Sequence, residues 1–349
     1  MVQHGRGVGP RTLRGRLSDA RRHGGRGVRD GWARGVRARR CEGRMMADRM
    51  MECRRKGSAA MVVRNATAAM IVRELKTNAK PLLIWCVVIV LFNVAGVMKF
   101  EGIAAGDAEA VRQLTVAFPK VALAVMGISD LDMSTFAGYY AVLEFYVGIM
   151  AAVYAVSLAR NAVSREMTDG TYEFLFVRPV TRARILTAKL LAALIDAIIF
   201  AAVNLVSSLL CLPMLGDALG GGDGVGASAA ESGAATVIWR FCVWLFALML
   251  VFAAIAACAC AVCARPDRGA AIGNASVVVA YGAGVVYDMF ADHDAALVAR
   301  VLSPFRYATP DEIIHGTAPI AFVALSALIV AVGIVTAFVA FDRRDLAVR

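Results

Sequence analysis

The chain has 349 residues, an apolar content of 59% and a mean hydropathy of +0.63. These values exceed those of ordinary soluble domains and exclude a purely soluble fold. The net charge of +11 would suit a nucleic-acid-binding protein, but 17 of the 38 basic residues lie within positions 1–56, which hold only five acidic residues. That segment carries +12 and the rest of the chain −1, so we predict no nucleic-acid partner.

Residues 1–60 alternate Arg and Gly and lack the apolar periodicity that a folded core needs. We expect this segment to be disordered. A basic arm for anionic lipid or nucleic acid and an Arg-rich transit peptide are alternative interpretations. We favour a third one, in which translation starts further along the chain, at one of Met45, Met46, Met50, Met51 or Met61.

Six apolar stretches approach the roughly 20 residues that a helix needs to cross a bilayer. They are Pro81–Met98, Phe136–Ala159, Leu186–Leu212, Val237–Ala264, Ala270–Phe290 and Pro319–Phe341. The sequence therefore predicts an all-α polytopic integral membrane protein with six transmembrane helices, spanning residues 79–349. An even number of spans places both termini on the same side of the bilayer.

The charges of the short flanking loops predict which side that is, because Arg-rich and Lys-rich loops stay in the cytoplasm. The loops on the side of the termini are rich in both residues, whereas the opposite loops contain only Lys99, Arg112, Lys120, Arg300 and Arg306. We therefore expect both termini to be cytoplasmic and the chain to lie in the cell membrane.

Several segments outside the spans have patterns of their own. Residues 61–78 have an apolar stripe at helical spacing and predict an interfacial elbow helix leading into the first span. Residues 99–135 predict a helical cap or a shallow re-entrant hairpin. The glycine-rich stretch Gly216–Ala235 resembles an exposed flexible linker. Gly269 and Gly273 permit a close helix approach, for which packing within the chain is the favoured explanation.

Ionisable groups inside a membrane cost about 2.5–3.5 kcal/mol and usually face a partner or a water-filled path. Glu144 and Asp196 are the two acids within the spans. With Asn204 they could line a translocation path or, in another interpretation, carry a proton. The alternative is that neighbouring hydroxyl groups or Asn204 satisfy them. Arg240 and Asp288 lie near the outer ends of their spans, where we expect them to reach toward the headgroups.

No metal site is predicted. Cys258 and Cys260 lie about 200° apart on a helix, so their thiols cannot converge with Cys263 on one ion. His293 and His315 lie in polar loops, where solvated polarity explains them better than a metal does.

The loop at 160–189, between the second and third spans, has the most distinctive pattern. Gly170 suits the end of one helix, Thr171 can cap a short new helix, and Pro179 ends it. Thr181 can cap the following span. The short helix would carry exposed aromatic side chains, among them Phe174, and exposed aromatics of this kind need a partner.

This loop resembles that of the ABC-2 type permeases, the membrane subunits of one class of ATP-binding-cassette exporters. The family pattern is Arg-Glu-x-x-x-Gly-Thr-x-Glu-x-Leu, followed by Pro, Arg and Lys. The chain supplies it with Arg165, Glu166, Gly170, Thr171, Glu173, Leu175, Pro179, Arg182 and Lys189. The elbow helix, the run Leu302-Ser303-Pro304-Phe305 and the C-terminal Phe341-Asp342-Arg343-Arg344 extend the similarity to about residues 61–349.

The resemblance implies a six-span permease fold of the type V exporter kind. It also implies a homodimer or heterodimer whose loop at about 164–182 couples to a separate ABC ATPase subunit. The sequence lacks the Gly-x-x-x-x-Gly-Lys-Ser/Thr loop that cradles phosphates, so ATP and magnesium would belong to that partner, and we predict no enzyme activity or cofactor for this chain. The alternatives are a proton-coupled carrier using Glu144 and Asp196, a membrane scaffold or sensor, and a membrane enzyme.

Overall fold

All regular structure in the described part of the chain is helical. The computed structural model describes residues 67–103, 113, 117–128, 131–168, 181–219, 225–263, 265–291, 293 and 296–343. They belong to one compact unit that covers Thr67–Arg349. The predictions for residues 1–60, including the later start of translation, lie outside the described residues.

Within these residues, six helices are long and apolar enough to cross a membrane, and each overlaps one of the predicted spans. They are Thr67–Ile103, Phe136–Arg165, Arg182–Leu215, Glu231–Val262, Pro266–Met289 and Ile320–Arg343. The prediction of an all-helical membrane protein with six spans is thus confirmed at the level of length and composition.

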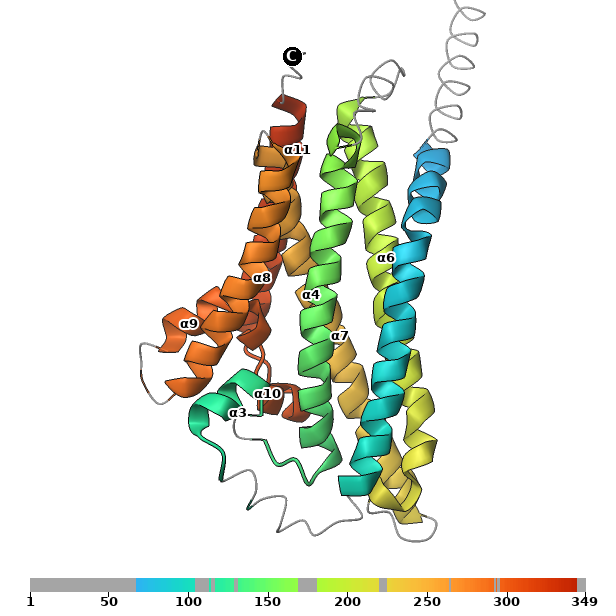
Figure 1. Ribbon diagram of the computed structural model, residues 1–349, viewed down its shortest axis with the longest axis vertical. Helices are drawn as coiled ribbons and strands as arrows, with labels where there is room; N and C mark the ends of the chain where they lie inside the picture. Colours follow the sequence, from blue (N-terminus) through green and yellow to red (C-terminus); the bar gives the residue numbers. More distant parts are fainter. Residues whose placement is uncertain are drawn as a thin grey trace, which may run out of the picture. The chain divides into compact units, whose positions relative to one another are not determined.

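Figure 1 shows these helices together with the shorter elements that connect them. After the first helix, Thr67–Ile103, the elements are α3 (Lys120–Met126), α4 (Phe136–Thr168), α6 (Arg182–Cys211), η1 (Leu212–Leu219), α7 (Val225–Val262), α8 (Pro266–Met289), α9 (Ala296–Leu302), η2 (Pro304–Arg306), α10 (Pro310–His315) and α11 (Ile320–Arg343). Local sequence explains several ends: Gly127 after α3 and Gly316 after α10 have φ of 72° and 71°, which glycine adopts without strain.

The core lies where α4 and α7 pack together, the most extensive helix pairing among the labelled elements. α7 also contacts α6, α8 and α11. Small residues permit these close approaches, as predicted for the two glycines at the start of α8. A Cβ added to Gly269 would lie 2.7 Å from the Cα of Cys260, and one added to Gly273 would lie 3.0 Å from a methyl group of Val156. Both contacts are within the chain.

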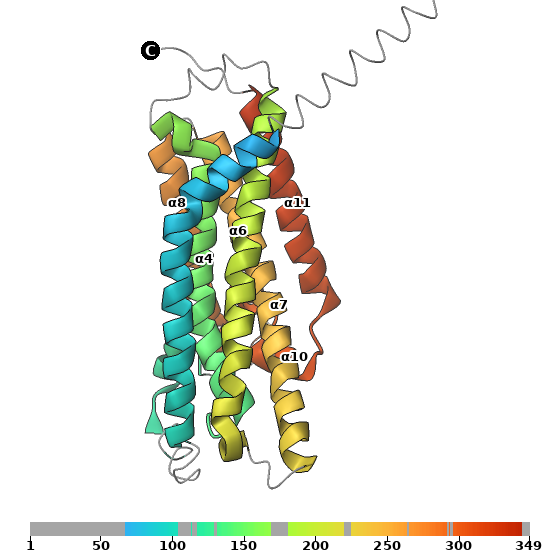
Figure 2. The same ribbon diagram turned by 90° about the vertical axis from the view of Figure 1, so that its right-hand side faces the viewer.

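The start of the first helix, the loop ends of α4 and α6, and the end of α11 lie at one end of the helix bundle in both views (Figures 1 and 2). We call this the loop end. The segment predicted as an elbow is continuous with the first span from Thr67 onward. Figure 2 shows its first turns running obliquely before the helix turns along the bundle.

The prediction of a flexible linker over Gly216–Ala235 is wrong for most of its length. η1 extends to Leu219, and α7 begins at Val225, so residues 225–235 are helical. The physical reason is the alanine content of that stretch, since alanine has the highest intrinsic helix propensity. Only residues 220–224 of the predicted linker lie outside the described residues.

Candidate functional site

The structure describes both flanks of the loop at 160–189 but not its middle. Residues 169–180, which include Gly170, Thr171, Glu173, Phe174, Leu175 and Pro179, lie outside the described residues. Their predicted helix breaks and exposed aromatics therefore stay predictions. The structure does describe both flanks: α4 continues to Thr168 and contains Arg165 and Glu166, and α6 begins at Arg182.

The flank at the start of α6 is tied to two other helices. Nη1 of Arg182 donates a hydrogen bond to the main-chain oxygen of Asp342 in α11, at 3.3 Å. About two turns further along, Lys189 is buried, and its Nζ lies 3.8 Å from Oε1 of Glu74 in the first helix. Two members of the loop pattern thus link the exit of the loop to the first and last spans.

Thr181 stands at the position predicted for it, but without the predicted bond. It is the N-cap residue of α6, with an extended backbone at φ −66° and ψ 145°. Its side chain accepts no hydrogen bond from the first turn of α6. The prediction is therefore right for the start of the helix and wrong for the capping hydroxyl.

Glu144 lies at the centre of a buried polar cluster. Its Oε1 accepts hydrogen bonds from the hydroxyl group of Tyr140 at 2.5 Å and from Nδ2 of Asn204 at 2.8 Å. The hydroxyl groups of Tyr140 and Ser208 lie 3.1 Å apart, and Nδ2 of Asn204 lies 3.5 Å from the sulfur of Cys242. The structure thereby confirms that hydroxyl and amide neighbours contact Glu144.

The same cluster extends to the first helix. Nδ2 of Asn93 donates to Oδ1 of Asn204 at 3.1 Å and to Oγ of Ser207 at 2.8 Å. Asn93, Tyr140, Asn204 and Cys242 come from the first four spans, and all four are buried. A buried polar network of this kind fixes the relative rotation and depth of the helices, because an unpaired polar group in a low dielectric is costly.

Asp196 belongs to a different group. Its Oδ2 accepts a hydrogen bond from Nδ2 of Asn78 in the first helix at 2.9 Å. Eight residues of α6 separate it from Asn204, which corresponds to about 12 Å along the helix axis. The structure therefore brings Glu144 and Asn204 together but leaves Asp196 outside their hydrogen-bonded cluster.

Two charged residues expected near the headgroups instead have partners inside the protein. Asp288 forms a buried ion pair with Arg306, and the two side chains are exposed by only 6% and 5%. Arg240 donates a hydrogen bond to the main-chain oxygen of Ile314. The expectation of snorkelling fails because the segment between α8 and α11 folds back against the spans and supplies partners there.

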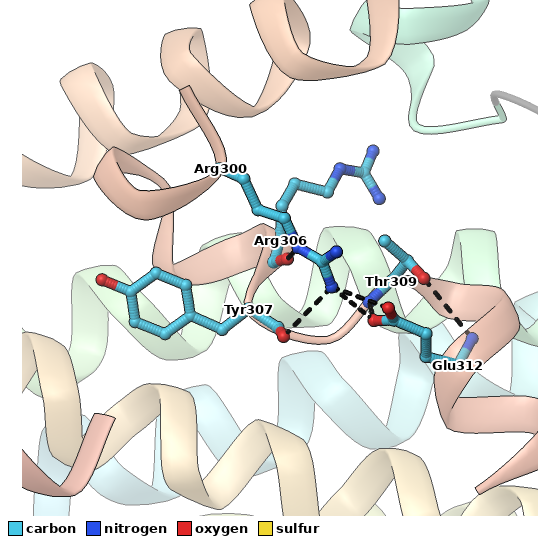
Figure 3. Close-up of polar contacts among 5 residues, drawn as sticks. All are labelled: Arg300, Arg306, Tyr307, Thr309 and Glu312. Atoms are coloured by element: carbon cyan, nitrogen blue, oxygen red, sulfur yellow. Dashed lines mark hydrogen bonds and ion pairs between the residues drawn. The ribbon is translucent and has the colours of Figure 1, made fainter. Parts of the chain in front are cut away.

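That segment is held together by Arg300, as Figure 3 shows. Nη2 of Arg300 contacts both carboxylate oxygens of Glu312, at 2.8 and 2.6 Å, and its Nε donates to the main-chain oxygen of Arg306 at 3.0 Å. Glu312 in turn forms a capping box with Thr309 at the start of α10. One arginine thus joins α9, η2 and α10 into one hydrogen-bonded unit.

This unit closes one side of a pocket that Glu144 lines from the other side. The pocket encloses a cavity of about 80 Å³ and is open to solvent on one side. Its walls come from α4, α7 and residues 304–313, and its charged lining residues are Glu144 and Arg306. A polar residue within an apolar span, such as Asn93, could have suggested the cluster. Nothing in the sequence indicates that Arg306 lines the same pocket as Glu144.

Comparison with known proteins is consistent with this architecture. The family model described as ABC-2 family transporter protein matches residues 68–346. No curated protein matches the chain. Since the match covers the whole helical unit, including both flanks of the loop, the chain belongs to the ABC-2 family of transporter proteins and is a multi-pass membrane permease of an ABC transporter.

Proposed function

We propose that this permease is the membrane subunit of an exporter in the cytoplasmic membrane, driven by a separate ABC ATPase that docks on the loop at 160–189. Membership of the ABC-2 family is the observation that carries the proposal. The family's permeases are transport components and normally work with an ATPase of this kind. ATP and magnesium would be bound by that partner.

The charge distribution supports a cytoplasmic position for the loop end. Arg165, Arg182, Arg184, Arg265 and Arg343 lie at the ends of the spans that meet there. At the opposite end, Arg300 and Arg306 are engaged by Glu312 and Asp288. An excess of basic side chains on one side favours the cytoplasm.

Two spans leave most of their surface uncovered within one chain, which supports a dimer. Only 17% of the most apolar window is buried for the first helix and 6% for α11. In a bilayer these faces meet lipid or another copy. We propose that a second permease subunit, identical or related, covers part of this surface.

The contacts of the loop flanks suggest how docking would act on the spans. Arg182 and Lys189 join the start of α6 to α11 and to the first helix. A displacement of the loop would therefore move three spans together. A carrier that relays protons directly between Glu144 and Asp196 is less well supported, because the two acids lie in separate hydrogen-bonded groups.

The test is purification of the tagged full chain from its native membranes, followed by measurement of vanadate-sensitive ATP hydrolysis in the eluate. We expect the activity to co-purify with the unaltered chain and to fall to background with Phe174→Ala or Glu166→Ala. Phe118→Ala is a matched control, because this aromatic side chain is 45% exposed and precedes α3 at the opposite end. The absence of ATPase from the unaltered chain, or its retention in both loop variants, would refute the proposal.

A further inference from the structure

The pocket beside Glu144 has the composition of a binding site for an amphipathic cation. Most of its lining is apolar or aromatic, and Glu144 is its one acidic side chain. The aromatic members are Phe145, Phe241, Trp244 and Phe305. A concave, mainly apolar surface with a few convergent polar groups is the usual form of a small-molecule site.

One carboxylate oxygen of Glu144 lacks a hydrogen-bond partner. Glu144 is only 5% exposed, and its Oε1 already accepts hydrogen bonds from Tyr140 and Asn204. Oε2 is buried and receives no hydrogen bond from the described residues. A buried acceptor left in this state is costly, so a donor that reached it from the pocket would be favourable.

The second charge at the pocket does not cancel that of Glu144. Arg306 is already neutralised by its ion pair with Asp288, and its guanidinium lies 5.5 Å from the ring centre of Phe145. Its Nε is buried and has no hydrogen-bond partner among the described residues. The pocket therefore offers one carboxylate for a cation and one N–H group for an acceptor on the same ligand.

The lining distinguishes an organic cation from a metal ion. Calcium and magnesium require six or more oxygen ligands, whereas the pocket supplies one carboxylate among aromatic rings. Those rings attract a cation through their π-electron faces and bury an apolar body at the same time. An anion would instead face the charge of Glu144.

We propose that this pocket binds an amphipathic organic amine in its protonated form, with an N–H group donating to Oε2 of Glu144 and the apolar body lying against Phe241, Trp244 and Phe305. This inference rests on the proposed function, because the amine would be the class of substrate that the permease moves. Arg306 donates through Nε to an acceptor elsewhere on the ligand. Asp196 takes no part in the site.

The test uses two fluorescent probes of nearly equal size, 9-aminoacridine, which is protonated at neutral pH, and acridine, which is neutral. Binding is measured by fluorescence on the purified full chain in lipid nanodiscs without any ATPase, and empty nanodiscs give the partition background. We expect the amine to bind about tenfold more tightly than acridine, the difference that one charge-assisted hydrogen bond supplies. Equal binding of the two probes would overturn the proposal.

Glu144→Gln tests the role of the carboxylate, because glutamine keeps one oxygen as the acceptor for Tyr140 and Asn204 and replaces Oε2, the acceptor of the proposed site, with a neutral amide nitrogen. We expect the affinity for 9-aminoacridine to fall about tenfold, to that of acridine. Asp196→Asn is the matched control, another buried acid made neutral outside the pocket, and should bind as the unaltered chain does. Unchanged binding in Glu144→Gln, or an equal loss in Asp196→Asn, would refute the assignment.

Gly148→Ala provides a second variant in case the first does not fold. A Cβ at this position lies 3.5 Å from Leu248, an ordinary contact, so the fold should accept it while the pocket narrows. We expect weaker binding of both probes. Unchanged binding of both would show that the probes bind outside this pocket. Since no ATPase is present, failure here leaves the co-purification result intact, and the two proposals can fail separately.

Discussion

Replacing Arg306 with methionine removes the cation from a buried ion pair while keeping a side chain of similar length. Arg306 and Asp288 are exposed by only 5% and 6%, and Arg306 bridges η2 to α8. Methionine would leave the Asp288 carboxylate without this partner in a region that water scarcely reaches. The cost of breaking a buried pair from one side is about 3–5 kcal/mol.

This cost should appear as a lower midpoint of thermal unfolding. With about 2 °C per kcal/mol for a chain of this size, Arg306→Met is expected to lower the midpoint by roughly 6–10 °C. The assay follows the monodisperse fraction of the detergent-solubilised chain by fluorescence-detected chromatography after heating. Combining Arg306→Met with Asp288→Asn removes both charges and should restore at least half of the loss, because no buried charge is then left without its partner.

Asp311→Asn is the control for the loss of a carboxylate in the same segment. Asp311 and its partner His315 are 80% and 65% exposed. Exposed ion pairs contribute at most about 1 kcal/mol to stability. The reasoning is refuted if Arg306→Met lowers the midpoint no more than Asp311→Asn does. It is also refuted if the Arg306 and Asp288 substitutions add, since additivity would show that the two charges do not interact.

Three further predictions concern topology and packing. In intact cells, a membrane-impermeant maleimide should label Lys120→Cys but not Arg184→Cys, both exposed positions, and the reverse pattern would place the loop end outside. Gly333→Ala should destabilise the fold by about 1–3 kcal/mol and so lower the thermal midpoint, because its Cβ would lie 2.9 Å from the main-chain oxygen of Ala254. An unchanged midpoint would contradict this contact. Arg300→Lys should cost about 1 kcal/mol in the same assay by losing its double contact with Glu312, and a stability equal to the parent chain would argue against that role.

The spans were predictable because a bilayer imposes a length and a composition on every crossing helix. The close approach at Gly269 was predictable for a related reason, since only a residue without a side chain lets two backbones come so near. Beyond the bilayer these constraints disappear. The glycine run before residue 225 indicated a linker, whereas the alanines after it already form the start of α7.

The surroundings of Glu144 were predictable only in part. Tyr140 lies one turn away on the same helix, so its contact follows from helical spacing alone. The contacts of Asn204 with Asn93 and Cys242 depend on the rotation and depth of four helices, which hydropathy does not determine. Asp288 was misjudged for the same reason, because its depth was inferred without the folded-back segment that brings Arg306 to it.

The loop and the polar cluster share the same two helices, and this has a mechanical consequence. The loop at 160–189 joins α4 to α6, and Glu144 on α4 is bonded to Asn204 on α6 at 2.8 Å. Protein N–H···O hydrogen bonds mostly have donor–acceptor distances of about 2.7–3.2 Å. A relative shift of α4 and α6 by even one ångström, driven from the loop, would therefore release or form the bond that holds the carboxylate at the pocket.

Asn204→Ala should consequently weaken the link between ligand and ATPase. With the co-purified complex, the measurement is the ratio of ATP hydrolysis with saturating 9-aminoacridine to hydrolysis without it. Saturation removes any effect of the substitution on affinity, so the ratio reports coupling alone. We expect the ratio to exceed one for the unaltered chain and to approach one for Asn204→Ala, because the carboxylate then loses its hydrogen bond to α6. An unchanged ratio would show that the coupling runs through other contacts, such as that between Arg182 and Asp342.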